Sequence, residues 1–142
     1  MKFTLTNYQD QAVSEVLEAL DEARVRFAKK GRLTAISLTA VTGAGKTVMA
    51  TAALEAMLFG NDQGIHPTPD LTVLWLTDDP SLNEQTRRKM LVASDRIAAK
   101  QVVTVGERLD QKTLNAGTIY FLNIHNGDPR LVLLSTIVAK DS

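Results

Sequence analysis

The chain has 142 residues, of which 44% are hydrophobic and 23% charged, and this length and composition are typical of one globular domain. Its formal net charge of zero excludes a general electrostatic attraction to nucleic acid, and the absence of cysteine excludes disulfides, thiolate metal sites and cysteine nucleophiles. Because no segment has the run of apolar residues that a membrane helix needs and no secretory signal begins the chain, we expect a soluble, cytoplasmic protein without a membrane partner.

The first element that the pattern predicts is a helix over residues 9–30. Its apolar residues recur at steps of three and four, which places them on one helix face: Val13, Val16, Leu17, Leu20, Ala23 and Phe27. Thr6 and Gln9 have the spacing of a capping box at its start, and Gly31 follows two lysines at its end. A short strand is predicted next over residues 33–39, which are rich in leucine, isoleucine and threonine.

A second helix is predicted over residues 46–59, where apolar side chains on several sides indicate burial against a sheet. Gly60 ends this helix. Residues 60–70 contain glycine, proline, asparagine and aspartate, which predicts a surface loop. The nearly continuous apolar run over residues 71–77 is typical of a central strand covered on both faces.

The remaining elements continue the alternation of helices and strands. A third helix opens at the capping box of Ser81 and Glu84 and extends toward Ala99. Further strands are predicted over residues 102–105, 118–122 and 131–137. Strands separated by helices require crossover connections, so we expect an α/β fold in which helices cover both faces of a mostly parallel sheet. Residues 1–142 are interpreted as a single domain.

The segment from Ala40 to Thr47 joins the first strand to the second helix and has the residues of a Walker A phosphate-binding loop. Gly43 and Gly45 allow the backbone to bring its N–H groups close to phosphate oxygens. Lys46 would neutralise the β- and γ-phosphates of ATP, Thr47 would ligate Mg²⁺, and the helix N-terminus adds partial positive charge. The predicted site for ATP and Mg²⁺ consists of Thr42, Gly43, Ala44, Gly45, Lys46 and Thr47. The alternative is a glycine-rich turn that opens a helix and exposes a lysine.

Three segments together resemble a known family. The phosphate loop starts with alanine where the strict Walker A pattern has glycine, and its form Ala-x-Thr-Gly-x-Gly-Lys-Thr resembles motif I of the superfamily-two helicases and translocases. The segment Thr6-Asn7-Tyr8-Gln9 resembles the upstream Tyr-Gln element of the same group. Residues 74–86, with the sequence LWLTDDPSLNEQT, are similar to motif Ia of the DEAD/DEAH-like branch that includes the Res subunits of type III restriction enzymes. The resemblance covers residues 3–123.

The resemblance implies a RecA-like P-loop NTPase domain that binds ATP and Mg²⁺. In the intact family such a domain contacts DNA and works with a partner motor domain or subunit. The resemblance also implies that Gln9 contacts the adenine edge, with Tyr8 packed nearby. The residues that it places near a nucleic-acid backbone are Thr77, Gln85 and Arg88.

These assignments have alternatives that the residues alone leave open. Gln9 can simply complete the capping box with Thr6. The run of Arg87, Arg88 and Lys89 can be a solvated helix face, which is the usual meaning of a short charge run. Trp75 lies in an apolar strand and is interpreted as a core residue rather than a stacking platform for a base.

No acidic Walker B segment is recognisable, although ATP hydrolysis in this class needs an aspartate for Mg²⁺ and a glutamate that activates water. The chain is therefore interpreted as the incomplete front part of a helicase motor, with residual or absent ATPase activity. In the main competing interpretation, a compact P-loop ATPase or small-molecule kinase uses Asp78 for magnesium and Asp79 as base. For the kinase, residues 60–70 are the candidate lid. A non-catalytic nucleic-acid-binding module is the third interpretation.

Overall fold

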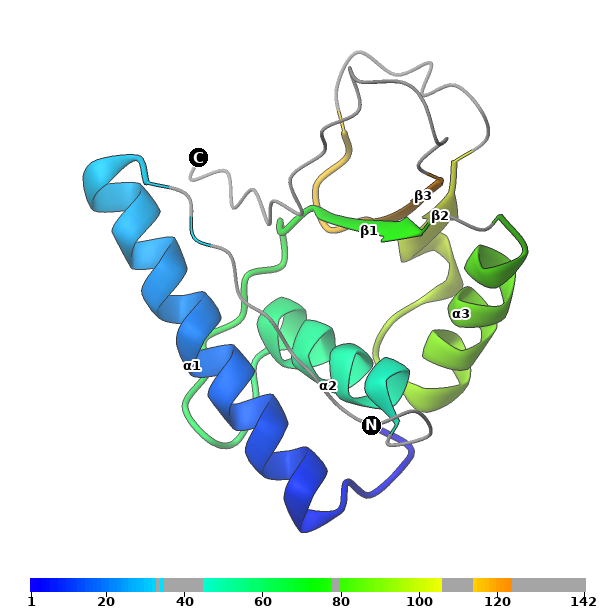
Figure 1. The fold of residues 1–142 in the computed structure, drawn as a ribbon, viewed down its shortest axis with the longest axis horizontal. Coiled ribbons are helices and arrows are strands. Elements are labelled where there is room, and N and C mark those ends of the chain that lie inside the picture. The colour runs from blue at the N-terminus through cyan, green and yellow to red at the C-terminus, as the bar shows by residue number, and fades with distance from the viewer. Residues whose placement is uncertain (33, 35–44, 78–79, 106–113, 124–142) are drawn as a thin grey trace.

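The computed structural model describes residues 1–32, 34, 45–77, 80–105 and 114–123 of the chain (Figure 1). Within these residues the helices are α1 (Asn7–Lys30), α2 (Lys46–Phe59), α3 (Pro80–Ala93) and the 3-10 helix η1 (Ala99–Gln101). The strands are β1 (Val73–Thr77), β2 (Val102–Thr104) and β3 (Ile119–Asn123). The strand predicted over residues 131–137, and all of the strand predicted over residues 33–39 except Thr34, lie outside the described residues.

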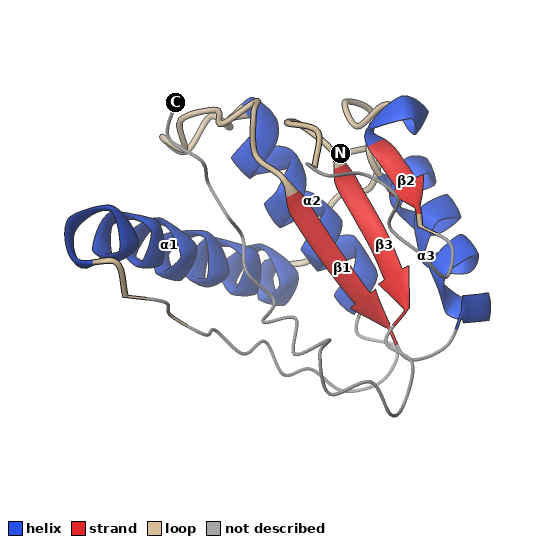
Figure 2. Cartoon of the chain, turned by 90° about the horizontal axis from the view of Figure 1, so that it is seen from above, coloured by secondary structure: helices blue, strands red, loops and turns tan. Residues whose placement is uncertain are grey.

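The three described strands form one parallel sheet in the order β1-β3-β2. Val73 and Val102 both pair with Ile119, so the three strands start at one edge of the sheet and end at the opposite edge. Helices α2 and α3 cover one face of the sheet, and α1 packs on the side of α2 away from α3 (Figures 1 and 2). This arrangement confirms the predicted α/β class with a parallel sheet. Of the two helix layers expected, the described residues supply one.

The core between the sheet and its helices is apolar, and both the strands and the helices α2 and α3 supply residues to it. Its buried members are Leu54, Leu58, Leu71, Val73, Met90, Ile97, Val102, Ile119 and Phe121. Trp75 packs against this cluster, and its ring stacks on that of Phe121 with the centroids 5.5 Å apart. The two residues are direct partners in the register of β1 and β3. The interpretation of Trp75 as a core residue is confirmed.

Helix α1 begins and ends at the predicted signals. The hydroxyl of Thr6 accepts a hydrogen bond from the Gln9 N–H at 3.3 Å, and the Gln9 amide oxygen accepts one from the Thr6 N–H at 3.1 Å. Gly31 ends the helix in the left-handed region, with φ at 64°. The apolar cluster between α1 and α2 consists of Val13, Leu17, Met49, Ala52, Ala53 and Ala56. Neither α1 nor any other described helix combines the length and the hydrophobicity of a membrane span.

Helix α3 is shorter than predicted, because it ends at Ala93 rather than near Ala99. The hydroxyl oxygen of Ser94 accepts a hydrogen bond from the Ile97 N–H at 3.0 Å and so turns the chain out of the helix. The same hydroxyl donates to Oε2 of Glu55 at 2.5 Å. Glu55 belongs to α2, so a contact with another helix orients Ser94. Sequence signals near the end of α3 do not predict such a contact.

Candidate functional site

The start of α2 has the geometry of an anion site. Gly45 precedes the helix with φ at 79° and ψ at 39°, a conformation that residues with a Cβ rarely adopt. Among the described residues no side chain caps this helix, so its first N–H groups point outward without a side-chain acceptor. Lys46, the first residue of the helix, is exposed. The N–H groups, the helix dipole and the ammonium group together favour a bound anion.

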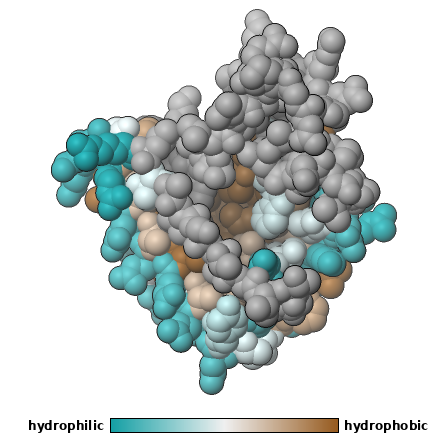
Figure 3. All heavy atoms as spheres, viewed as in Figure 1, coloured by the Kyte–Doolittle hydropathy of each residue, from teal (hydrophilic) through white to brown (hydrophobic). Residues whose placement is uncertain are grey.

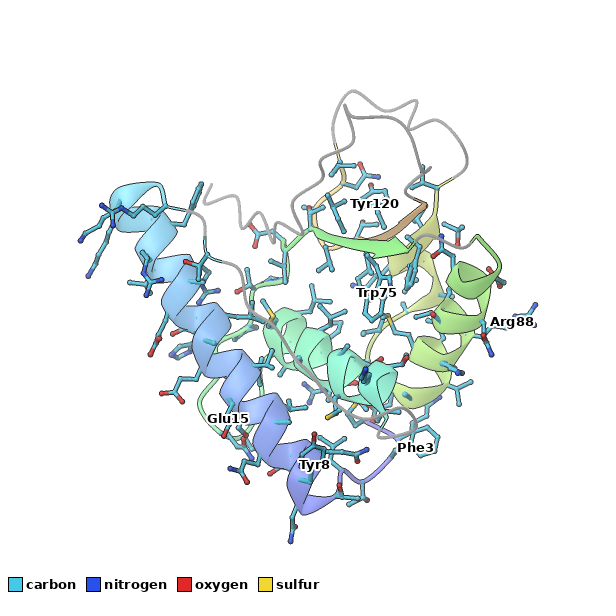
Figure 4. All side chains as sticks on the ribbon, viewed as in Figure 1. Phe3, Tyr8, Glu15, Trp75, Arg88 and Tyr120 are labelled. Atoms are coloured by element: carbon cyan, nitrogen blue, oxygen red, sulfur yellow. The ribbon has the colours of Figure 1, made fainter. Side chains whose placement is uncertain are left out.

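The side chain of Gln9 lies directly against this helix start. A Cβ built on Gly45 would lie 2.6 Å from Nε2 of Gln9, so a larger residue at this position would require the glutamine amide to shift. The Oε1 atom of Gln9 meanwhile accepts the capping hydrogen bond from Thr6. The two interpretations of Gln9 are thus compatible, because one side chain closes the capping box and also lies beside Gly45. Tyr8, in the first turn of α1, is 55% exposed (Figure 4).

Helix α2 is held firmly behind this site. Thr51 is fully buried, and its hydroxyl donates to the carbonyl oxygen of Thr47 at 2.7 Å, which fixes the first turn. Further along the helix, the buried carboxylate of Glu55 accepts from the amino group of Met1 at 2.7 Å and from Ser94. These hydrogen bonds raise the pKa of the Met1 amino group, first through Glu55 and then through Asp95. A helix anchored in this way keeps its N-terminus in a fixed position.

The end of β1 and the start of α3 hold the other predicted contacts. Thr77 is the last residue of β1 and therefore lies at the edge where the parallel strands end. Gln85 and Arg88 are both exposed on α3, and their spacing of three residues places them on one helix face. Arg88 is 76% exposed, points away from the protein, and pairs with Glu84 at 3.4 Å (Figure 4).

Arg87 has a different role from its basic neighbours. Its guanidinium donates to the carbonyl oxygen of Val102 at 3.1 Å and to that of Ala99 at 3.4 Å. The arginine therefore fastens α3 to η1 and to the start of β2. The basic run in the sequence did not distinguish Arg87 from its neighbours, because the carbonyl groups it binds are brought to it only by the fold.

Several predicted site residues lie outside the described residues. They are Thr42, Gly43, Ala44, Asp78 and Asp79. Of the predicted ATP and magnesium ligands, Gln9, Gly45, Lys46 and Thr47 are described. The described part of the chain contains no group of three or more histidine, aspartate or glutamate side chains that could hold a metal ion by themselves.

The sequence was compared with known protein families. The family described as "Type III restriction enzyme, res subunit" matches residues 2–133. The match includes every described helix and strand, and it includes Gln9, the start of α2 and the end of β1. No curated protein and no solved structure matches the chain.

Proposed function

The chain belongs to the type III restriction enzyme res subunit family, whose members are P-loop ATPases, and on that premise we propose that it binds Mg-ATP through residues 42–47. One observation carries the proposal: Gln9, which the helicase resemblance assigns to the adenine, lies against Gly45 at the start of α2. Two segments far apart in the sequence thus meet where a nucleotide would need both. No described side chain caps the N-terminus of α2, so in the proposal its first N–H groups bind the phosphates.

Each described residue of this site has a defined task in the proposal. The ammonium group of Lys46 neutralises the outer phosphates, and the first N–H groups of α2 donate to phosphate oxygens. The Thr47 hydroxyl ligates Mg²⁺, which when bound screens the charge between phosphate groups. Gln9 offers an amide to the base edge and Tyr8 an exposed aromatic ring beside it. The residues present therefore fit ATP and one magnesium ion.

We place nucleic acid at the surface formed by the end of β1 and the exposed face of α3. Among the described residues, the one ion-pair partner of Arg88 is the exposed Glu84, and such pairs contribute about 0 to 1 kcal/mol. A DNA phosphate can therefore replace Glu84 as the partner of Arg88 at small cost. Gln85 lies on the same helix face and adds a neutral donor. In the intact family, ATP-driven closure against a second motor domain would turn this contact into movement along DNA.

We further propose that residues 1–142 by themselves turn over little or no ATP. Phosphate binding without a positioned base and an arginine from a partner domain leaves most of the transition-state stabilisation unmade. A compact enzyme that uses Asp78 and Asp79 is the alternative. Turnover that Asp79→Asn abolishes would favour this alternative, whereas turnover near the uncatalysed rate in both proteins agrees with the proposal.

Thermal unfolding with and without Mg-ATP tests the binding proposal. At ten times the dissociation constant, a ligand that binds only the folded chain adds about 1.4 kcal/mol, or roughly 5 °C in Tm for a chain of this size. We expect Lys46→Ala to remove this shift and Lys100→Ala to keep it, because Lys100 is an exposed lysine on η1, away from α2. Equal shifts in the two variants would contradict the proposed site.

A further inference from the structure

The C-terminal end of α1 projects from the rest of the described chain. Every residue from 25 to 32 is exposed, whereas the buried residues of the helix, Val13 and Leu17, lie in its first half. Figure 3 shows hydrophilic side chains gathered at this projecting end of the helix. The residues at this end of the helix therefore do not pack in the core.

Four of these exposed residues are cationic, and we call them the α1 basic patch: Arg26, Lys29, Lys30 and Arg32. None of the ion pairs found among the described residues involves a member of this patch. Arg24, two residues before Arg26, behaves differently, since it pairs with Asp21 at 2.9 Å and donates to the Thr68 hydroxyl at 2.7 Å. Arg26 donates only to the neutral hydroxyl of Thr34, at 3.1 Å.

The arrangement costs the isolated helix stability. Lys29 and Lys30 follow Arg26 by three and four residues, so the three cations share a helix face, and each such like-charge pair is unfavourable by about 0.2 to 0.5 kcal/mol. Favourable interaction with the helix dipole accounts for cations in the last turn. It does not account for Arg32, which lies beyond the Gly31 cap. A negatively charged partner would relieve the repulsion among all four.

The shape of the surface agrees with an extended polyanion. The patch lines an open depression of about 500 Å³, which also includes Val25 and, toward the middle of the helix, Asp21 and Glu22. Glu22 lies four residues before Arg26 on the same helix face, so these carboxylates end the basic surface toward the middle of the helix. Side chains that neighbour each other on one helix face lie about 5 to 6 Å apart. Duplex DNA carries a phosphate charge about every 1.7 Å along its axis, so its charges are spaced closely enough to meet several cations of the patch.

We propose that the α1 basic patch binds backbone phosphates of duplex DNA, as a second contact separate from the nucleotide site. Gln9 and Lys30 are 21 residues apart on one helix, or about 32 Å at 1.5 Å per residue. The patch and the start of α2 are therefore separate places on the protein, one at each end of α1. The inference rests on the proposed function for its choice of DNA as the polyanion, whereas the anionic character of the partner follows from the patch itself.

The test is the salt dependence of binding of the full chain to a fluorescent duplex, measured by anisotropy. Lys29→Gln/Lys30→Gln removes two phosphate contacts and should make the slope of log K against log salt shallower by about 1.8. Between about 50 and 200 mM salt, the variant should then lose about 12-fold less affinity than the unchanged chain. Lys2→Gln/Lys100→Gln is the matched control, because it removes two exposed lysines outside the patch and should leave the slope unchanged.

Two further measurements separate the outcomes. If Lys29→Gln/Lys30→Gln leaves the slope of log K against log salt unchanged, the inference is overturned. If Arg88→Gln makes that slope shallower in the same series, DNA binds at α3 and not at the α1 basic patch. A slope lowered by the patch variant but not by Arg88→Gln supports the patch and removes the α3 contact. A fluorescent poly-glutamate peptide that binds the chain as tightly as the duplex does would overturn the choice of DNA and assign the patch to an acidic protein segment.

Discussion

Replacing Gly45 with alanine tests the contact between Gln9 and the start of α2. The substitution has two separate costs. Alanine in the left-handed conformation of Gly45 is strained by about 1 to 2 kcal/mol. The new Cβ would also lie 2.6 Å from Nε2 of Gln9, so the amide must move and release the N–H of Thr6 that it caps. Loss of this one hydrogen bond of the capping box costs about 1 kcal/mol, while the Thr6 hydroxyl keeps its bond from the Gln9 N–H, so we expect a total of about 2 to 3 kcal/mol.

Gly31→Ala provides the matched control for this substitution. Gly31 has φ at 64°, and a Cβ built there has no atom within 4 Å. The control therefore carries the backbone strain without the steric contact. The difference between the two variants, about 1 kcal/mol, measures the contact with Gln9.

Urea unfolding gives this difference directly when Gly45→Ala and Gly31→Ala are each compared in the unchanged chain and in a Gln9→Ala background. With an m-value of about 2 kcal/mol per molar, the midpoint of Gly45→Ala should lie about 0.5 M below that of Gly31→Ala. In a Gln9→Ala background the two midpoints should coincide, because the side chain that meets the new Cβ has been removed. Equal midpoints in the unchanged background, or a difference that persists without Gln9, would refute the contact.

Three other predictions concern the anchors around the site. Glu55→Ala removes the buried acceptor of the Ser94 hydroxyl and one of the two carboxylates bound to the Met1 amino group, so urea unfolding should show a loss of about 1 to 3 kcal/mol; a loss below about 0.5 kcal/mol would contradict the anchoring role. Stability should also depend on pH at both limits, as measured by thermal unfolding. Glu55 and Asp95 raise the pKa of the Met1 amino group above 8.0, so this group stabilises the fold below pH 8 and the stabilisation is lost as the pH rises through the raised pKa. The same amino group lowers the pKa of Asp95 from 3.8, so the stabilisation from Asp95 is lost only as the pH falls through the lowered pKa. Arg87→Ala should cost about 1 to 2 kcal/mol through its two backbone acceptors, whereas Arg88→Ala should leave the urea midpoint within about 0.5 kcal/mol of the unchanged chain and weaken only DNA binding.

The helices that the sequence predicted best are those whose ends depend on local signals. Helix α1 begins at the capping box of Thr6 and Gln9 and ends at Gly31, and α2 has the predicted bounds from Lys46 to Phe59. Each of these signals involves residues within one turn of the helix end. The sequence pattern therefore contained the information that the fold uses.

Features that depend on contacts between elements were not predictable in the same way. The early end of α3 depends on Ser94, whose hydroxyl is oriented by Glu55 from α2. The structural role of Arg87 depends on carbonyl groups that the fold delivers from η1 and β2. The position of Gln9 beside Gly45 joins residues 36 positions apart, and only the resemblance to helicases indicated that they belong to one site.

Isothermal titration calorimetry of the chain with Mg-ATP tests the proposed nucleotide site most directly. We predict saturable binding of one nucleotide per chain and its loss in Lys46→Ala, with urea unfolding as proof that both proteins are folded. Equal binding by Lys46→Ala, or no binding by the folded unchanged chain, would contradict an ATP site at the start of α2.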